Sequence, residues 1–491
     1  MTPIARRFGV TTRTALGHSK TWPRGSPIVY TARAQHARSS TQIGRSRIKG
    51  IEALKVNPGR LMDTLHETCL WGTGKRWGIG PDDTGMARLA LSDTDKQARD
   101  WFVETTSSLG CDVNVDAMGN IFAVRPGRQK GPATFAGSHL DTQPNGGRYD
   151  GILGVLAGIE MLKTLNDYKF ETKFPIGVVN WTNEEGARFP ISMVSSGVWA
   201  EEIAFNTAHN LLEVGGGAAT MRSELERIGY LGSIPASYRS LPMAAHFELH
   251  IEQGPVLEAE QKKIGVVHGV QAYRWYTIEV NGRDAHTGTT PLSNRADAML
   301  LAARLITHSH RLATKHSALA STGILTLTPG SMNTIPGLVT FTLDVRAPAD
   351  STVDAMEADL KRDFAALAAG ENVGGLLDGA TPSWPLRVSW MTNSVSPAIK
   401  FHPTCIAAVR DSAEAVTGGK KLVHDMSSGA GHDSVYTSRH CPTSMIFVPS
   451  KDGISHNPKE YTSPEDCVIG AQVLLQSILR YDRMRTSAYV V

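Results

Sequence analysis

The sequence has few cysteines, and those it has are scattered. There are five, an odd number, and none forms a C-x-x-C pair: Cys69, Cys111, Cys405, Cys441 and Cys467. This pattern argues against a disulfide framework or a zinc site built from thiolates, and it is typical of a reducing, intracellular environment. Long apolar runs are also absent. No stretch of about 18 uninterrupted apolar residues occurs, so we expect no membrane-spanning helix and no membrane partner.

Acidic residues are missing from the first 50 positions, which hold ten of the 50 Lys and Arg residues. This composition, rich also in Ser, Thr and Ala, is typical of a mitochondrial transit peptide. An untargeted basic tail and an upstream start site in the gene are the alternatives; without mitochondrial targeting we expect a cytoplasmic protein. The remaining chain has 40 basic residues against 47 acidic ones. It offers no broad basic surface, so we expect no nucleic-acid partner.

The order of apolar segments predicts an α/β domain. PATFAGSHLDT (132–142) is typical of a short buried strand, GILGVLAGIEMLKTL (151–165) of an apolar helix, and FPIGVVNWTNEEG (174–186) of a second strand. A strand, a helix and a strand in this order predict a right-handed βαβ unit in a largely parallel sheet. In such sheets the functional side chains follow the carboxyl ends of the strands.

A second kind of organisation begins at about residue 265. From there to 396 the periodicity predicts a β-α-β-β-α-β order, which is that of a ferredoxin-like α+β module; its first strand is expected to be one long strand, GVVHGVQAYRWYTIEVNGR. We therefore divide the chain into a basic segment (1–50), a first part of the α/β domain (57–264), an insertion (265–396) and a second part of the α/β domain (397–491).

Four polar segments carry metal-ligand side chains, and each follows or interrupts a predicted strand. They are GSHLDTQPNGGRYDG (137–151), NWTNEEGARF (180–189), HFELHIEQG (246–254) and DGISHNP (452–458). Taken singly, each has a plain alternative, such as a solvated acidic turn or a structural histidine. Together they supply the imidazoles and carboxylates that divalent metals need when no thiolates are offered.

These motifs, with GRDAHTGTTPL, MNTIPG and DVRAP, resemble in order the signatures of the amidase, hydantoinase and carbamoylase branch of the di-metal aminoacylase and carboxypeptidase family. The resemblance covers about residues 57–485. It implies a catalytic α/β domain like that of di-metal exopeptidases, with a mixed, mostly parallel sheet. It also implies that the inserted ferredoxin-like domain serves as a lid and pairs two subunits into a homodimer.

The resemblance further implies a metal site and a general base. Two divalent ions per subunit are expected, with Zn²⁺ favoured, although Mn²⁺, Co²⁺ and Ni²⁺ accept the same ligand types. Asp150 would bridge the two ions, and Asp141 would orient one of the histidines, His139. Glu184 would act as general base. The ligands implied are His139, Asp150, Glu185, His250 and His456.

Four more residues are implied in substrate binding and catalysis. Gln253 would contact the carbamoyl end of the substrate, while Asn333 and Arg346 would hold its carboxylate. His286 would polarise the scissile carbonyl group. In the family, the lid residues His286 and Asn333 are thought to reach the active site of the partner subunit.

The expected reaction is metal-assisted hydrolysis of the carbamoyl C–N bond of an N-carbamoyl-L-amino acid or of β-ureidopropionate. The products would be the free amino acid, CO₂ and NH₃. Alternatives are an allantoate amidohydrolase, an N-acyl amino acid or peptide metallohydrolase, and a non-catalytic binding protein that has kept the fold. Trp275 weakly favours the first hypothesis, because allantoate enzymes tend to carry an Arg at that position, which would suit a second ureido group.

Overall fold

The computed structural model describes residues 50–376 and 386–486. The predicted transit peptide therefore lies, apart from Gly50, outside the described residues. The helices of the described part include none that is long and apolar enough to cross a membrane.

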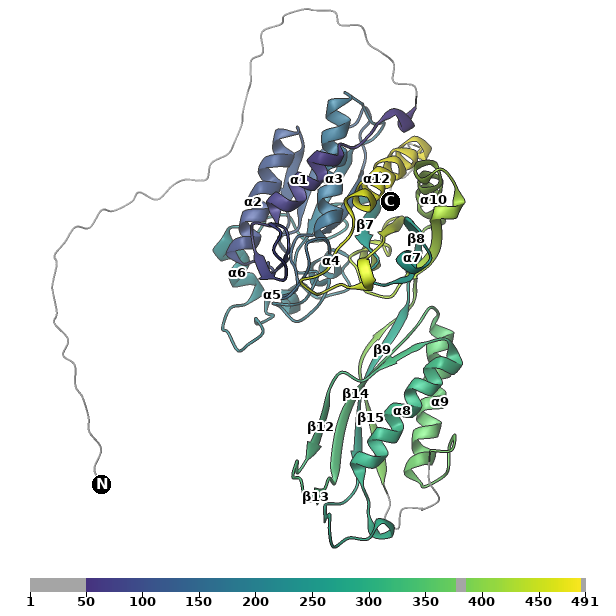
Figure 1. Cartoon of the computed structure of the whole chain (residues 1–491). Helices are drawn as coiled ribbons and strands as arrows, with labels where there is room; N and C mark the ends of the chain where they lie inside the picture. Colours follow the sequence, from purple (N-terminus) through teal and green to yellow (C-terminus); the bar gives the residue numbers. More distant parts are fainter. Residues whose placement is uncertain (1–49, 377–385, 487–491) are drawn as a thin grey trace, which may run out of the picture. The chain divides into compact units, whose positions relative to one another are not determined.

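A nine-stranded mixed sheet forms the centre of the α/β domain (Figure 1). Its four neighbouring central strands, in the order β18-β7-β5-β6, are all parallel, while the flanking β4, β3 and β16 are antiparallel to their neighbours. This confirms the predicted α/β fold with a mixed sheet, although only the centre is uniformly parallel. The strands are β3 (Asp112–Val115), β4 (Ile121–Arg125), β5 (Ala133–His139), β6 (Ile176–Trp181), β7 (Met243–Ile251), β8 (Ile264–Val270), β16 (Ile399–Lys400), β17 (Val423–Ser428) and β18 (Thr443–Val448).

Helix α3 (Ile152–Asp167) is the predicted apolar helix, and it packs against β5, β6 and β7. Two glycines allow this close approach. A Cβ atom at Gly154 would lie 2.4 Å from the carbonyl oxygen of Leu249 in β7, and one at Gly158 would lie 2.9 Å from Val178 in β6. The glycines therefore allow α3 to pack closely on the sheet, and α3 begins directly after the loop that carries Asp150.

The other helices of this domain begin and end where local signals indicate. Helix α2 (Asp93–Ser108) begins after Ser92, whose hydroxyl accepts a hydrogen bond from the backbone N–H of Asp95. The remaining elements are α1 (Pro58–Thr68), α4 (Val194–Trp199), α5 (Phe205–His209), α6 (Met221–Ile228), α7 (Val256–Ala259), α10 (Pro403–Thr417), α11 (Ser434–Thr437), α12 (Pro464–Met484), the strand pair β1 (Thr73–Arg76) and β2 (Thr84–Met86), and the 3₁₀ turns Ile51–Ala53, Lys420–Leu422 and Lys451–Gly453.

The inserted region forms a five-stranded antiparallel sheet with the order β15-β9-β14, in which β11 and β12 both pair with β14. Its elements are β9 (Ala272–Asn281), β10 (Ala285–His286), a 3₁₀ turn (Leu292–Asn294), α8 (Ala298–His316), β11 (Leu319–Ser321), β12 (Leu325–Thr328), β13 (Thr334–Ile335), β14 (Leu338–Ala347), α9 (Asp350–Ala368) and β15 (Arg387–Ser396). With β11 and β12 taken as one broken edge strand beside β14, and with the separate pair β10 and β13 set aside, the order is the ferredoxin-like β-α-β-β-α-β.

The long strand expected from residue 265 is two strands. Residues 264–270 form β8, which pairs with β18 and β17 in the nine-stranded sheet, and the chain enters the five-stranded sheet only after Gln271. The predicted domain boundary at 265 therefore falls within β8. The break could not be seen in the sequence because residues on both sides of it favour strands, and which sheet a strand joins depends on tertiary contacts.

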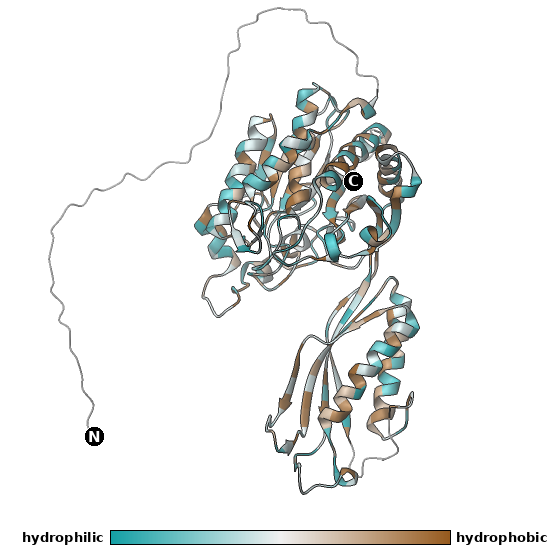
Figure 2. Cartoon of the chain, in the orientation of Figure 1, coloured by the Kyte–Doolittle hydropathy of each residue, from teal (hydrophilic) through white to brown (hydrophobic). Residues whose placement is uncertain are grey.

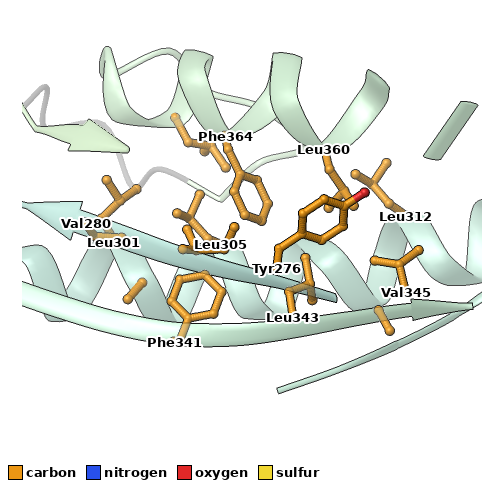
Figure 3. Close-up of a cluster of buried hydrophobic side chains, with 14 of the residues drawn as sticks. Tyr276, Val280, Leu301, Leu305, Leu312, Phe341, Leu343, Val345, Leu360 and Phe364 are labelled. Carbon is orange, nitrogen blue, oxygen red and sulfur yellow. The ribbon is translucent and has the colours of Figure 1, made fainter. Parts of the chain in front are cut away.

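A single core holds α8 and α9 against one face of the five-stranded sheet. Figure 3 shows Leu305 of α8 and Phe364 of α9 lying over Tyr276, Phe341 and other strand residues, and all of these side chains are buried. Figure 2 shows hydrophobic and hydrophilic patches alternating along both helices, as expected for helices with one face on a sheet.

Candidate metal centre and active site

Four of the five candidate metal ligands lie at or just after the carboxyl ends of four adjacent parallel strands. His139 is the last residue of β5, Glu184 and Glu185 follow β6, and His250 lies near the end of β7. His456 follows β18 through a short turn. Parallel neighbours end at the same edge of a sheet, so residues far apart in the chain meet there.

Asp150 lies at the centre of this group. Its Oδ1 is 3.0 Å from Nε2 of His250 and 3.6 Å from Nε2 of His139. Its Oδ2 is 3.4 Å from Nε2 of His456 and accepts a hydrogen bond from the Gln253 amide at 2.8 Å. The two oxygens thus face different histidines, as a carboxylate between two cations must.

Two candidate groups of ligand atoms share this carboxylate, and a third consists of Glu248, His250 and His432. Of the two that share it, one is His139, Asp150 and His250, and the other is Asp150, Glu185 and His456; within each group the atoms lie within 4.8 Å of one another. The donors are nitrogen and oxygen, without thiolates, which fits Zn²⁺ and similar divalent ions. The residues present therefore fit a metal centre, and each of the five expected ligands belongs to one of these candidate groups.

Asp141 contacts His139 through its backbone carbonyl group and not through its carboxylate. Nδ1 of His139 lies 2.9 Å from the backbone carbonyl oxygen of Asp141. The Asp141 carboxylate instead accepts hydrogen bonds from the backbone N–H groups of Glu184 and Glu185, each at 3.3 Å. Its side chain thus holds the turn that presents both glutamates.

Glu184 is buried beside the first ligand group, with its Oε2 3.5 Å from Nε2 of His139. Burial, together with the charge of Asp433, raises the pKa of Glu184 well above its ordinary value. A raised pKa makes the Glu184 carboxylate a stronger proton acceptor, which suits a group that accepts and returns a proton.

The charges of the candidate ligands depend on one another. Burial lowers the pKa of His139 to about 4, and burial together with Asp150 raises the pKa of Glu185 to about 8. For His250 burial opposes the charged form, but Asp150 outweighs it and raises the pKa to about 9. A divalent cation would change this balance, because it favours carboxylates and neutral imidazoles as ligands.

A cleft of about 250 Å³ opens at this centre, and Arg346 of β14 is among its lining residues. Nε and Nη2 of Arg346 donate to the Asp344 carboxylate, and Nη1 donates to the carbonyl oxygen of Gly429 at 2.8 Å. One further N–H remains on each of Nη1 and Nη2. Tyr273 and Trp275 line the same cleft, with their rings 5.2 Å apart.

The structure does not bring His286 and Asn333 to this cleft. His286 is exposed in β10, which pairs with β13, and Asn333 immediately precedes β13. The two residues lie together, since the backbone N–H of Thr287 donates to the carbonyl oxygen of Asn333 at 3.0 Å. Neither is among the residues that line the cleft of the same chain.

Sequence reasoning missed three residues of the site. His432 lines the cleft and packs edge-on against His250, with ring centroids 4.6 Å apart. Gln143 donates to Oε2 of Glu185 at 2.9 Å, and Glu460 accepts from the backbone N–H of Asp150. The signals were the histidine and acid in GAGHDS (429–434) and the acid that follows SHNP, both in stretches rich in turn residues.

The chain is similar to proteins of one family along most of its length. Residues 135–480 match peptidase family M20/M25/M40. An N-carbamoyl-L-amino-acid amidohydrolase from Rhizobium meliloti is 37% identical over 431 residues, which cover 87% of this chain and 97% of that protein. An allantoate amidohydrolase from Bacillus subtilis is 30% identical over 399 residues, covering 80% and 92%. The crystal structure of an amidase of the hydantoinase/carbamoylase family from Burkholderia multivorans has a TM-score of 0.79 at 42% identity, covering 88% of this chain and 100% of that one.

Proposed function

The chain belongs to peptidase family M20/M25/M40, and we propose that it is a metal-dependent amidohydrolase that cleaves the carbamoyl C–N bond of N-carbamoyl amino acids. Several relatives carry the name N-carbamoyl-L-amino-acid amidohydrolase, and one of them, at 37%, is more similar to this chain than the allantoate amidohydrolase at 30%. The substrate class includes N-carbamoyl-L-amino acids and β-ureidopropionate.

The position of Asp150 between two ligand groups is the observation that carries this proposal. We assign one divalent ion to His139, Asp150 and His250, and a second to Asp150, Glu185 and His456. Zn²⁺ suits this set, and Mn²⁺, Co²⁺ and Ni²⁺ are alternatives. When bound, such a pair of cations lowers the pKa of a shared water and polarises the substrate carbonyl.

Glu184 is the residue that moves the proton. It accepts a proton from the attacking water, which forms a bond to the carbamoyl carbon, and it returns that proton to the nitrogen that leaves as the C–N bond breaks. Decomposition of the carbamate then gives the amino acid, CO₂ and NH₃, with one water consumed overall. The burial of Glu184 and the distance of 3.5 Å between its Oε2 and Nε2 of His139 support this role.

Arg346 is assigned to the substrate carboxylate. The Asp344 carboxylate fixes its guanidinium group, and the N–H groups left on Nη1 and Nη2 provide a pair of donors for a carboxylate in the cleft. Gln253, which contacts both Asp150 and His456, is placed to contact the carbamoyl end. Tyr273 and Trp275 provide an apolar wall, which suits an amino acid side chain better than the second ureido group of allantoate.

We further propose a homodimer formed through the inserted domain, in which His286 and Asn333 reach the cleft of the partner subunit. Neither residue lines the cleft of its own chain, and His286 is exposed; both observations support this arrangement. There His286 would polarise the scissile carbonyl, and Asn333 would help Arg346 to hold the carboxylate. The basic composition of residues 1–50 supports import into mitochondria.

An ammonia assay tests the proposed activity. Metal-loaded protein is incubated separately with N-carbamoyl-L-amino acids, N-carbamoyl-β-alanine and allantoate, and released ammonia is measured. We expect turnover of the carbamoyl amino acids at a higher kcat/KM than allantoate. Turnover of N-acyl amino acids, with none of any ureido substrate, would contradict the proposal and favour the acyl amino acid hydrolase instead.

A further inference from the structure

Glu460 joins the loop of Asp150 to the loop of His456. Its side chain is buried, and its Oε1 accepts hydrogen bonds from the backbone N–H groups of Tyr149 and Asp150, each at 3.0 Å. Its Oε2 lies 3.0 Å from the hydroxyl of Ser455, and the same hydroxyl lies 2.8 Å from Oδ2 of Asp150. One carboxylate therefore contacts both the backbone of Asp150 and, through Ser455, its side chain.

The backbone near Asp150 is packed directly on this carboxylate. A Cβ atom at Gly147 would lie 2.2 Å from Oε1 of Glu460 and 2.3 Å from its Cβ. Only glycine allows so close an approach. Gly147, which has no side chain, therefore leaves the space that the Glu460 side chain occupies.

The two ligand groups differ in how firmly the chain holds them. His139 and His250 are fully buried within strands β5 and β7, whereas the side chain of His456 is 48% exposed and its backbone has a φ of 53°. A non-glycine residue adopts this left-handed conformation only when its surroundings stabilise it. The group that contains His456 therefore depends more on the contacts between loops.

We propose that Glu460 is a positioning residue for the metal position formed by Asp150, Glu185 and His456. By fixing the backbone of Asp150 and the hydroxyl of Ser455, it directs Oδ2 of Asp150 toward His456. The first position uses Oδ1 and the histidines at the ends of β5 and β7, whereas the hydrogen bonds of Glu460 go to Tyr149, Asp150 and Ser455. This inference rests on the proposed pair of ions.

Metal stoichiometry and affinity test it without reference to activity. Chelator-treated wild type, Glu460→Ala and Glu460→Gln are titrated with Zn²⁺ by calorimetry, and bound metal is counted by mass spectrometry. We expect two ions in the wild type. In Glu460→Ala the affinity for one ion should fall about 10- to 100-fold, the usual effect of removing a residue that orients a ligand, while the other ion stays near wild-type affinity.

Glu460→Gln should restore most of the lost affinity, because the amide oxygen still accepts both N–H groups and its NH₂ group donates to Ser455. The matched control is Glu160→Ala. Glu160 is also buried and accepts a backbone N–H, that of Asn57 at 2.8 Å, but it belongs neither to the candidate ligand groups nor to the lining of the cleft. The substitution Glu160→Ala should lower thermal stability without changing metal binding. Ser455→Ala, which removes one arm of the contact, replaces Glu460→Ala if the latter does not fold.

Two results would overturn the inference: unchanged affinity for both ions in Glu460→Ala, or equal weakening of both ions without restoration by Glu460→Gln. A wild type that binds fewer than two ions would instead contradict the proposed pair of ions. The two failures are therefore distinct.

Discussion

Nε2 of His250 lies 3.0 Å from Oδ1 of Asp150, a contact that joins the end of β7 to the loop before α3. Both side chains are buried, and buried charged groups must be paired or bind a cation. The other oxygen of Asp150 faces His456. Asp150 is thus the residue common to these two ligand groups, while His250 also belongs to a third candidate group with Glu248 and His432.

Asp150→Asn should weaken both metal positions. An amide keeps the shape of the side chain but supplies one neutral oxygen in place of two charged ones. We expect the affinity for each ion to fall by more than about 100-fold, exceeding the effect of removing a residue that only supports a ligand. Bound metal counted after dialysis against buffer measures this. A variant that keeps one ion at wild-type affinity would show that Asp150 does not bridge.

Glu184→Gln should separate catalysis from metal binding. The amide cannot accept a proton from water, so we expect kcat to fall about 100- to 10,000-fold with metal content unchanged. Glu185→Gln is the companion variant, and it should lose the ion held with His456. Loss of metal from Glu184→Gln, with retention by Glu185→Gln, would mean that the two adjacent glutamates have exchanged roles.

The positions of the polar motifs after or within predicted strands could be read from the sequence, while the choice of ligands among their residues rested on the family resemblance. Once β5, β6, β7 and β18 are neighbours, their carboxyl ends bring His139, Glu185, His250 and His456 together without further information. The general fold followed from the same alternation of strands and helices.

Residues whose role depends on contacts between distant loops could not be predicted in this way. Glu460 contacts Asp150 across more than 300 positions, and its role is visible only in the hydrogen bonds to backbone N–H groups. For Asp141, the sequence indicated a contact with His139 but not that the backbone makes it. The break between β8 and β9 could not be predicted either, because it depends on β8 pairing in the nine-stranded sheet and β9 pairing in the five-stranded one.

Arg346→Lys should weaken substrate binding more than catalysis. Lysine keeps the charge but lacks the paired N–H donors that match a carboxylate. We expect KM to rise about 10- to 100-fold with kcat little changed, corresponding to the loss of a hydrogen bond to a charged group. Arg274→Lys is the control, because Arg274 pairs with Asp354 and Glu357 of α9. Equal effects of both changes would show that the effect at Arg346 is structural.

His246 should make the protein sensitive to acid. It is fully buried, with Nε2 3.5 Å from Nε1 of Trp181, and burial lowers its pKa to about 3. Between pH 6.5 and 3 the unfolded chain therefore binds a proton that the folded protein does not. In this range His246 lowers the free energy of unfolding by about 1.4 kcal/mol for each unit that the pH falls.

Urea unfolding at several pH values measures this dependence. His246→Gln should flatten it between pH 6.5 and 3, whereas His310→Gln, a change at an exposed histidine of α8, should leave it as in the wild type. An unchanged slope in His246→Gln would show that His246 does not titrate differently in the folded and unfolded states.

Subunit mixing tests whether His286 acts in the partner's cleft. Glu184→Gln and His286→Ala should each be nearly inactive as homodimers, the first without its general base and the second without the group that polarises the carbonyl. A mixed dimer has one cleft with both defects and one with neither, because its Glu184 and the His286 that reaches it come from different chains. Equal mixing with full exchange should therefore restore about a quarter of wild-type activity, since half of the dimers are mixed and each has one intact cleft. If His286 acts in its own chain, every cleft keeps one defect and the mixture stays inactive.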